Sequence, residues 1–190
     1  MSSAGDTSTD AELLRRIAAG DAPAVAELYD RHAGMLFALA LRIVRDRGDA
    51  QDVVHDAFVA VGERASQYVP ERGAVGAWIV TLVRNLSIDR MRRRERRAAI
   101  ARDVIAHDPD AKAATPADPE ALLVGATERE RVRRALAQLP EVQRATLEVA
   151  FYEGLTYAEI AEREGVPLGT IKSRAARALQ ALREALGREP

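Results

Sequence analysis

The sequence predicts an all-α protein with two small helical domains joined by a flexible linker. Three observations lead to this fold class. Ala, Leu, Arg and Glu, which favour helices, dominate the 190 residues, and β-branched runs are few. Apolar residues recur at helical spacing on both sides of residue 110. Between these two groups, the stretch 103–118 is rich in Asp, Pro, Ala and Thr and has little apolar surface to bury.

Composition excludes several classes of protein. Hydrophobic residues make up 47% of the chain, which is enough for a packed core. There is no cysteine, so disulfides, thiolate zinc sites and thiol redox sensing are excluded. The N-terminal stretch is polar and acidic without an apolar signal region, and no run approaches the length of a membrane span. We therefore expect a soluble, cytoplasmic protein.

Charge is distributed unevenly although the net charge is only −1. Residues 84–102 contain eight arginines and two acids, whereas residues 103–120 contain five acids and one lysine. A basic patch beside an acidic linker indicates a local anionic partner better than the net charge does.

The first domain is expected over residues 10–98, after a disordered stretch at 1–9. A capping box between Thr9 and Glu12 predicts the start of its first helix, and Gly20 its end. Three further helices are predicted at about 24–44, at 49–65 with Asp49 as the cap, and from Val75 until the helix dissolves into the arginine run.

The second domain is expected over residues 119–187, after a linker at 99–118. Asp118-Pro119 predicts its start, because Asp caps helices and Pro is tolerated in a first turn. Breaks at Pro140, Gly154 and Gly165 divide it into helices at about 120–137, 141–152, 157–164 and 168–186.

The last two of these helices have the pattern of a helix-turn-helix. Thr156 and Glu159 form a capping box at the start of the first helix. Ala161, Gly165 and Ile171 then place a small residue, a turn residue and a β-branched residue at the spacing that a DNA-binding helix-turn-helix requires.

The second helix of this pair has one apolar and one polar side. At about 100° per residue, Thr170, Ser173 and Arg177 point away from the apolar sector, and Lys172 and Arg174 flank it. Short polar side chains and Arg suit base edges, and outer cations suit phosphates. We interpret it as a DNA-reading helix; the alternative is an amphipathic helix with a solvated basic face.

An acidic stripe on the predicted 49–65 helix admits three interpretations. Asp49, Asp52, His55 and Asp56 lie along one side of it. A metal site would need a matching acid–histidine pair on another helix, which the sequence lacks. A solvated face or a docking surface for a basic partner remain. We find no catalytic set and expect no cofactor, so the chain is predicted not to be an enzyme.

Four motifs together resemble the short, two-domain sigma factors of bacterial RNA polymerase, the extracytoplasmic-function (ECF) group of the sigma-70 family. They are DAQDVVHDAFVAV at 49–61, YVPERGAVGAWI at 68–79, LVRNLSIDRMRRRERR at 82–97, and the long run from Leu139 to Arg183. The motifs occur in the order that this family has, and they cover most of residues 10–186.

This resemblance implies three binding surfaces. The core-polymerase surface comprises Asp49, Asp52, His55, Asp56 and Phe58. The surface for the promoter −10 element, which captures a flipped base, comprises Tyr68, Arg72, Trp78, Asn85, Asp89, Arg92 and Arg93. The surface for the −35 element comprises Thr170, Lys172, Ser173, Arg174 and Arg177.

The resemblance also implies partners: core RNA polymerase, promoter DNA and an anti-sigma factor, for which the run at 151–161 resembles members controlled by a membrane-anchored one. The chain departs from the family pattern at His55, where glutamine is usual, at Gly62, where an aromatic is usual, and at Val75-Gly76, where an aromatic and an Arg are usual.

Three alternatives to a sigma factor follow from the residues. A stand-alone helix-turn-helix regulator would need a dimerising helix, and none remains after both domains are assigned. A sigma-like decoy that binds only an anti-sigma factor would not need the basic recognition face. A helical enzyme would need a catalytic set.

Overall fold

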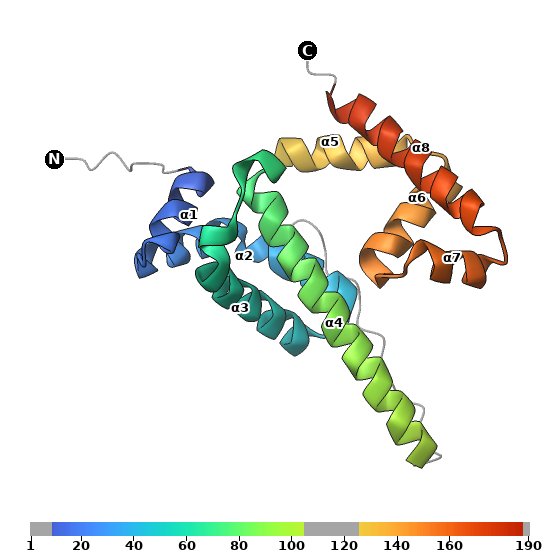
Figure 1. The fold of residues 1–190 in the computed structure, drawn as a ribbon, viewed down its shortest axis with the longest axis horizontal. Helices are drawn as coiled ribbons and strands as arrows, with labels where there is room; N and C mark the ends of the chain where they lie inside the picture. Colours follow the sequence, from blue (N-terminus) through green and yellow to red (C-terminus); the bar gives the residue numbers. More distant parts are fainter. Residues whose placement is uncertain (1–8, 105–125, 188–190) are drawn as a thin grey trace. The chain divides into compact units, whose positions relative to one another are not determined.

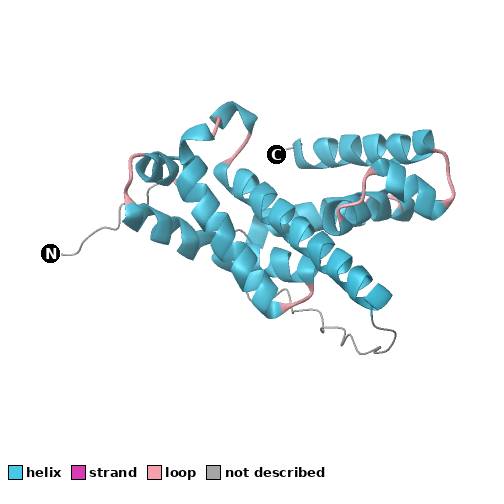
Figure 2. Cartoon of the chain, turned by 60° about the horizontal axis from the view of Figure 1, so that its bottom comes forward, coloured by secondary structure: helices cyan, strands magenta, loops and turns pink. Residues whose placement is uncertain are grey.

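The structure is a computed structural model that describes residues 9–104 and 126–187. Every regular element in these two ranges is helical (Figures 1 and 2), which confirms the predicted all-α class. The chain divides into two compact units between residues 122 and 123. The stretch predicted to be disordered up to residue 8, and the predicted linker from residue 105 onward, lie outside the described residues. None of the described helices is long and apolar enough to cross a membrane.

The described part of the first unit consists of four helices and two short 3₁₀ turns. Its elements are α1 (Asp10–Ala18), α2 (Ala22–Val44), α3 (Arg47–Arg64), η1 (Ala65–Gln67), η2 (Pro70–Arg72) and α4 (Val75–Val104).

The junction of α2 and α3 differs from the prediction. Arg45 ends α2 in the left-handed region, with φ 56°, and its N–H donates to the carbonyl of Leu41. Asp46 is then extended and accepts a hydrogen bond from the backbone N–H of Asp49 at 2.8 Å. Asp46 is therefore the cap, and the prediction that Asp49 caps this helix was wrong. The chain turns at Arg45 and α3 begins at Arg47, so Gly48 lies inside α3 and does not break the helix.

Helix α4 continues through the arginine run to Val104, although the sequence predicted that it would dissolve there. Arginine is a good helix former, which favours this continuation. An ion pair of 2.6 Å between Arg93 and Asp89, four residues apart, adds to it at the start of the run. The arginines are consequently displayed at fixed angles around a helix.

A single apolar core holds α1 to α4 together. Leu13, Leu28, Leu36, Val61 and Ile79 are among its fully buried side chains. Because this core occupies the inner faces of α3 and α4, their polar residues are left on the outer faces and along the seam between the two helices.

The second unit contains the helix-turn-helix. Its described elements are α5 (Ala126–Ala137), α6 (Glu141–Glu148), the π-helical turn η4 (Val149–Glu153), α7 (Tyr157–Glu164) and α8 (Leu168–Gly187).

Local hydrogen bonds fix the bounds of α7 as predicted. The Thr156 N–H donates to Glu159 Oε2 at 2.6 Å, and the Glu159 N–H donates to Thr156 Oγ1 at 3.2 Å, which confirms the capping box. Gly165 ends α7 with φ 66°, where a side chain would be strained. The helix predicted at 141–152 instead changes to π-helical geometry at Val149.

Few side chains form the centre of the helix-turn-helix. Ile160 and Ile171 are fully buried and Ala161 is 7% exposed, with partly buried residues packed around them. The predicted small, turn and β-branched residues therefore occupy the angle between α7 and α8.

Candidate nucleic-acid interfaces

Two carboxylates of the acidic stripe on α3 are paired with α4. Arg90 donates from Nε to Asp49 Oδ1 at 2.7 Å and from Nη2 to Asp52 Oδ2 at 2.7 Å. Arg94 Nη1 lies 3.8 Å from Asp49 Oδ2. The hydrogen bond to Asp49, followed by the nearby charges, raises the pKa of Arg90 above its ordinary value. Asp52 nevertheless keeps 62% of its side chain exposed, against 23% for Asp49.

The other residues predicted to bind polymerase separate into two environments. His55 and Asp56 lie exposed on α3. Phe58 is only 6% exposed, and its ring packs against Tyr29 with centroids 4.9 Å apart, so Phe58 is a core residue in this structure. No group of three His, Cys, Asp or Glu side chains that could hold a metal occurs in the described part of the chain.

A groove of about 460 Å³ runs along the seam between α3 and α4. Its α3 side carries carboxylates and its α4 side mostly arginines, over the apolar side chains of Val53 and Leu86. The charged lining residues are Asp49, Asp56, Asp89, Arg90, Arg93, Arg94 and Arg97.

The loop before α4 is organised by Tyr68. Its hydroxyl donates to the carbonyl of Gly73 at 2.8 Å, and its ring lies 5.8 Å from that of Trp78, centroid to centroid. Trp78 is half-buried against the core, and Arg72 is exposed on η2. Tyr68 and Trp78, both predicted to contact the −10 element, are thus brought together, and the exposed Arg72 belongs to the loop between them.

Of the predicted −10 residues of α4, Asp89 and Arg93 line the groove between α3 and α4, whereas Asn85 and Arg92 are not part of its lining. Asn85 accepts from Arg84 at 3.3 Å, and Asp89 pairs with Arg93. Burial, and then the charge of Arg92, lowers the pKa of Arg84. At about 100° per residue, Asn85 lies about 140° and Arg92 about 160° around the helix from Arg90. One helix therefore carries separate inner and outer arginines.

The predicted −35 residues of α8 are not equally available. Lys172 and Arg177 are exposed, and Thr170 is half-buried. The Ser173 hydroxyl donates to the carbonyl of Thr170 at 2.9 Å. Arg174 donates from Nη1 to Glu164 Oε2 of α7 at 2.6 Å.

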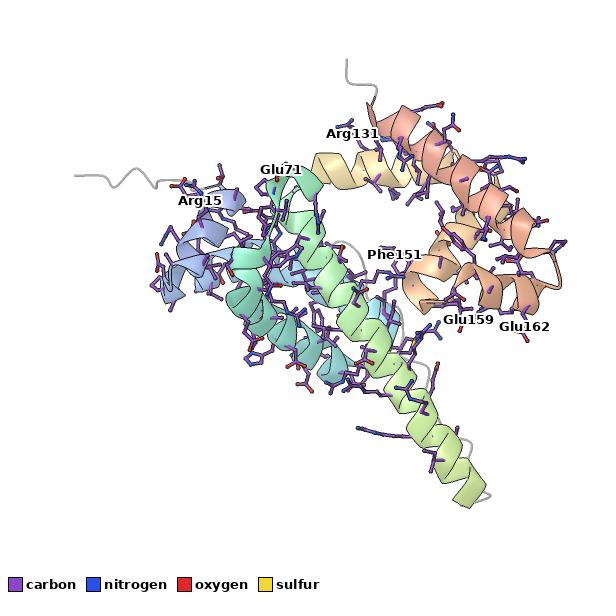
Figure 3. All side chains as sticks on the ribbon, viewed as in Figure 1. Arg15, Glu71, Arg131, Phe151, Glu159 and Glu162 are labelled. Carbon is purple, nitrogen blue, oxygen red and sulfur yellow. The ribbon has the colours of Figure 1, made fainter. Side chains whose placement is uncertain are left out.

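Three residues with clear contacts were missed by the sequence predictions. Arg90 joins α4 to α3, Glu164 joins α7 to α8, and Arg131 donates from Nη2 to the carbonyl of Leu186 near the end of α8 at 2.9 Å (Figure 3). Their charge was visible in the sequence, but their partners lie 10 to 55 positions away and no local pattern identifies them.

Two family models match the chain. One, described as "Sigma-70 region 2", matches residues 28–97, and the other, described as "Sigma-70, region 4", matches residues 129–182. The first therefore covers most of the four-helix unit, and the second covers the helix-turn-helix.

Curated relatives match over nearly the whole chain. The ECF RNA polymerase sigma factor SigK of Mycolicibacterium vanbaalenii is 36% identical over 181 residues, which span 92% of this chain and 88% of the relative. The protein of the same name from Mycobacterium tuberculosis is 35% identical over 176 residues, spanning 92% and 91%.

Solved structures that match the chain include Rhodobacter sphaeroides SigE in complex with the anti-sigma ChrR. It is 30% identical and has a TM-score of 0.49, over 95% of this chain and 99% of that one. The sigma factor RpoE in complex with the anti-sigma factor NepR from Bartonella quintana is 24% identical with a TM-score of 0.36, over 83% and 92%.

Proposed function

We infer the role of each surface from one premise: the chain belongs to the ECF RNA polymerase sigma factors of the sigma-70 family. It is a non-enzymatic factor that directs transcription initiation, with core RNA polymerase and promoter DNA as its partners. The observation that carries this conclusion is the occurrence of both sigma-70 regions, in order, on a chain that matches curated sigma factors over 92% of its length.

We propose that residues 10–98 act as region 2 and residues 119–187 as region 4. The matched ranges 28–97 and 129–182 lie inside these bounds, and the two compact units support the division. We also place the protein in the cytoplasm, where core polymerase and the promoter are found.

The α3 stripe is proposed to dock on a basic surface of core polymerase. Asp52, His55 and Asp56 are exposed on one helix and are available to such a partner. Opposite charges across an interface set the rate and register of association. Phe58 would support docking by packing α3 against Tyr29 of α2, and Asp49, whose side chain is 23% exposed, would add a partly buried carboxylate to the same stripe.

Alanine at Asp52 and Asp56 together is expected to abolish co-purification with core polymerase, because it removes two docking carboxylates. Arg90→Ala is the matched control, since it breaks the Asp52 ion pair but leaves both carboxylates in place. This control variant should still bind core polymerase. Thermal melting of both variants checks that they are folded.

Two results would contradict the docking proposal. One is a double variant, with Asp52→Ala and Asp56→Ala, that still co-purifies with polymerase and supports promoter-specific transcription. The other is equal loss of binding in the Arg90→Ala control, which would place the effect in the α3–α4 packing and not in the carboxylates.

The loop before α4 and the outer side of α4 are proposed to bind the −10 element as single-stranded DNA. Tyr68 and Trp78 offer aromatic surface for an unstacked base, with Arg72 beside them for a phosphate. Extruding a base costs a few kcal/mol, which favours weakly paired sequences. Asn85 and Arg92 on the outer side of α4, with Asp89 and Arg93 at the rim of the groove, would contact the strand along the helix.

Helix α8 is proposed to read the −35 element in the major groove. Lys172 and Arg177 are exposed cations that lie outside its buried stripe, one on each side of it. Ser173 lies between them in sequence and Thr170 lies just before Lys172, and both present short polar side chains near the same surface. Such a helix would read base edges with its middle and phosphates with its outer cations.

Control by an anti-sigma factor is proposed from the run at 151–161, which resembles that of members held by a membrane-anchored partner. Affinity purification of the tagged protein from detergent-solubilised membranes should recover one such partner in a complex without polymerase. Recovery of polymerase alone, from cells grown with and without envelope stress, would contradict this.

A further inference from the structure

Arg163 and Glu164, at the end of α7, form ion pairs with two different elements: Arg163 with the turn before α7 and Glu164 with α8. Arg163 donates to Glu153 of the π-helical turn that precedes α7. Glu164 accepts from Arg174 of α8, which follows it. The end of α7 is therefore held from both sides, directly before Gly165.

The position of Arg174 on α8 fits a contact with α7 better than a contact with DNA. At about 100° per residue, Arg174 lies about 65° from the middle of the buried stripe formed by Ile171, Ala175 and Ala178, whereas Arg177 lies about 125° from it. The side chain of Arg174 is accordingly only 23% exposed, and that of Glu164 is 33% exposed.

Although α8 also packs against α5 and α6, the apolar core that α7 and α8 share is small. Their shared core consists chiefly of Ile160, Ala161 and Ile171. The polypeptide between them turns at Gly165, which lies in the left-handed region. A hydrogen-bonded ion pair of 2.6 Å that bridges this turn therefore adds a directional restraint where apolar packing is limited.

We propose that Arg174 is a positioning residue for promoter recognition and does not contact a phosphate. Through Glu164 it sets the direction of α8 relative to α7, and thereby places Lys172 and Arg177 against the −35 DNA. This inference rests on the proposed role of α8 as the −35 reader, and it changes the role that the sequence alone suggested for Arg174.

The two roles of Arg174 predict opposite effects of neutralising Glu164. If Arg174 binds a phosphate, Glu164 competes with the DNA, and Glu164→Gln should tighten binding. If Arg174 positions α8, Glu164→Gln removes its anchor and should weaken binding. A lost phosphate contact also lowers the slope of log K against log salt by about one, whereas a lost anchor leaves the slope unchanged.

The test measures the affinity of the full-length protein, bound to core polymerase, for a promoter duplex at several salt concentrations. Glu164→Gln and Arg174→Ala are each expected to weaken binding about three- to tenfold at every salt concentration, and the double variant by no more than either alone. Exchanging the charges, with Glu164→Arg and Arg174→Glu together, is expected to restore most of the affinity.

Lys172→Ala is the matched control on the same helix, and it should lower the salt slope by about one. Tighter binding by Glu164→Gln, with a lower slope for Arg174→Ala, would overturn the positioning role while leaving α8 as the −35 reader. Unchanged binding after both Lys172→Ala and Arg177→Ala would instead overturn the −35 assignment of α8, and the role of Arg174 with it.

Discussion

Gly76 lies in the first turn of α4, where a Cβ atom would be 3.5 Å from Cε1 of His32. This is an ordinary van der Waals distance, so alanine fits without moving the imidazole. Because glycine loses more backbone entropy on folding than alanine, Gly76→Ala is expected to raise the free energy of unfolding by about 0.5–1 kcal/mol, measured by urea denaturation. A loss of stability would mean that this turn needs the freedom of glycine.

Two other glycines serve as controls for this prediction. At Gly62, within α3, nothing lies within 4 Å of an added Cβ, so alanine should give a similar gain. At Gly165, φ is +66°, and alanine there should destabilise the protein because the left-handed region is unfavourable for side chains. Opposite signs at Gly62 and Gly165 would show that the denaturation assay separates helix propensity from backbone strain.

His32 also explains how the departure from the family pattern at Gly76 is accommodated. Its Nε2 lies 2.7 Å from Asp10 Oδ2, and Arg31 Nη1 lies 3.1 Å from the other oxygen of the same carboxylate. The imidazole is therefore held between α1 and α4 at the position beside Gly76. Val75, the neighbouring departure, is 3% exposed and packs in the core.

At the scale of helices, Arg90 joins α4 to α3 through two ion pairs. Arg90→Ala is expected to lower the free energy of unfolding by about 1 kcal/mol, because it removes two partly exposed ion pairs. Arg96→Ala, at an exposed position of the same helix, is the control and should change stability by less than about 0.5 kcal/mol. Equal effects of the two substitutions in thermal or urea unfolding would argue against a specific role for Arg90.

Helix ends could be predicted where the determining residues are close in sequence. The capping box of Thr156 and Glu159 and the left-handed Gly165 are of this kind. The cap at Asp46 was missed because Arg45, a residue with no special preference for the left-handed region, turns the chain there. The π-helical turn at Val149–Glu153 was missed because one extra residue per turn leaves little trace in a hydrophobic pattern.

The candidate interfaces could be predicted as surfaces but not as sets of contacts. The acidic stripe and the arginine run were visible, yet Arg90 pairs with residues 41 and 38 positions away. Such pairs depend on how α3 and α4 pack, which periodicity does not specify. The hydrogen bond of Arg174 to Glu164 was hidden for the same reason.

At the scale of the whole molecule, the net charge of −1 bears on how promoters are found. Non-specific DNA affinity depends on the number of phosphates that a protein neutralises. On this chain many arginines are paired with acids, as in Arg90 with Asp49 and Arg93 with Asp89. We therefore expect the protein without polymerase to leave no sequence-specific footprint on a promoter duplex and to melt none of it.

Footprinting with and without core polymerase at equal salt concentration tests this expectation. The same duplex with a pre-melted −10 region is the matched control, because it removes the cost of strand opening from the comparison. A strong, sequence-specific footprint by the protein alone on the intact duplex would contradict it.

The ion pair between Glu164 and Arg174 has a consequence for transplanting specificity. Grafting a recognition helix onto another protein assumes that its exposed residues alone carry its DNA specificity. In this chain the direction of α8 is set by the carboxylate of Glu164 on the preceding helix. A chimaera that received residues 168–187 alone would therefore contain the DNA-reading residues without the partner of Arg174. The transferable segment starts at Tyr157, and position 164 should vary together with position 174 in any sequence that keeps this geometry.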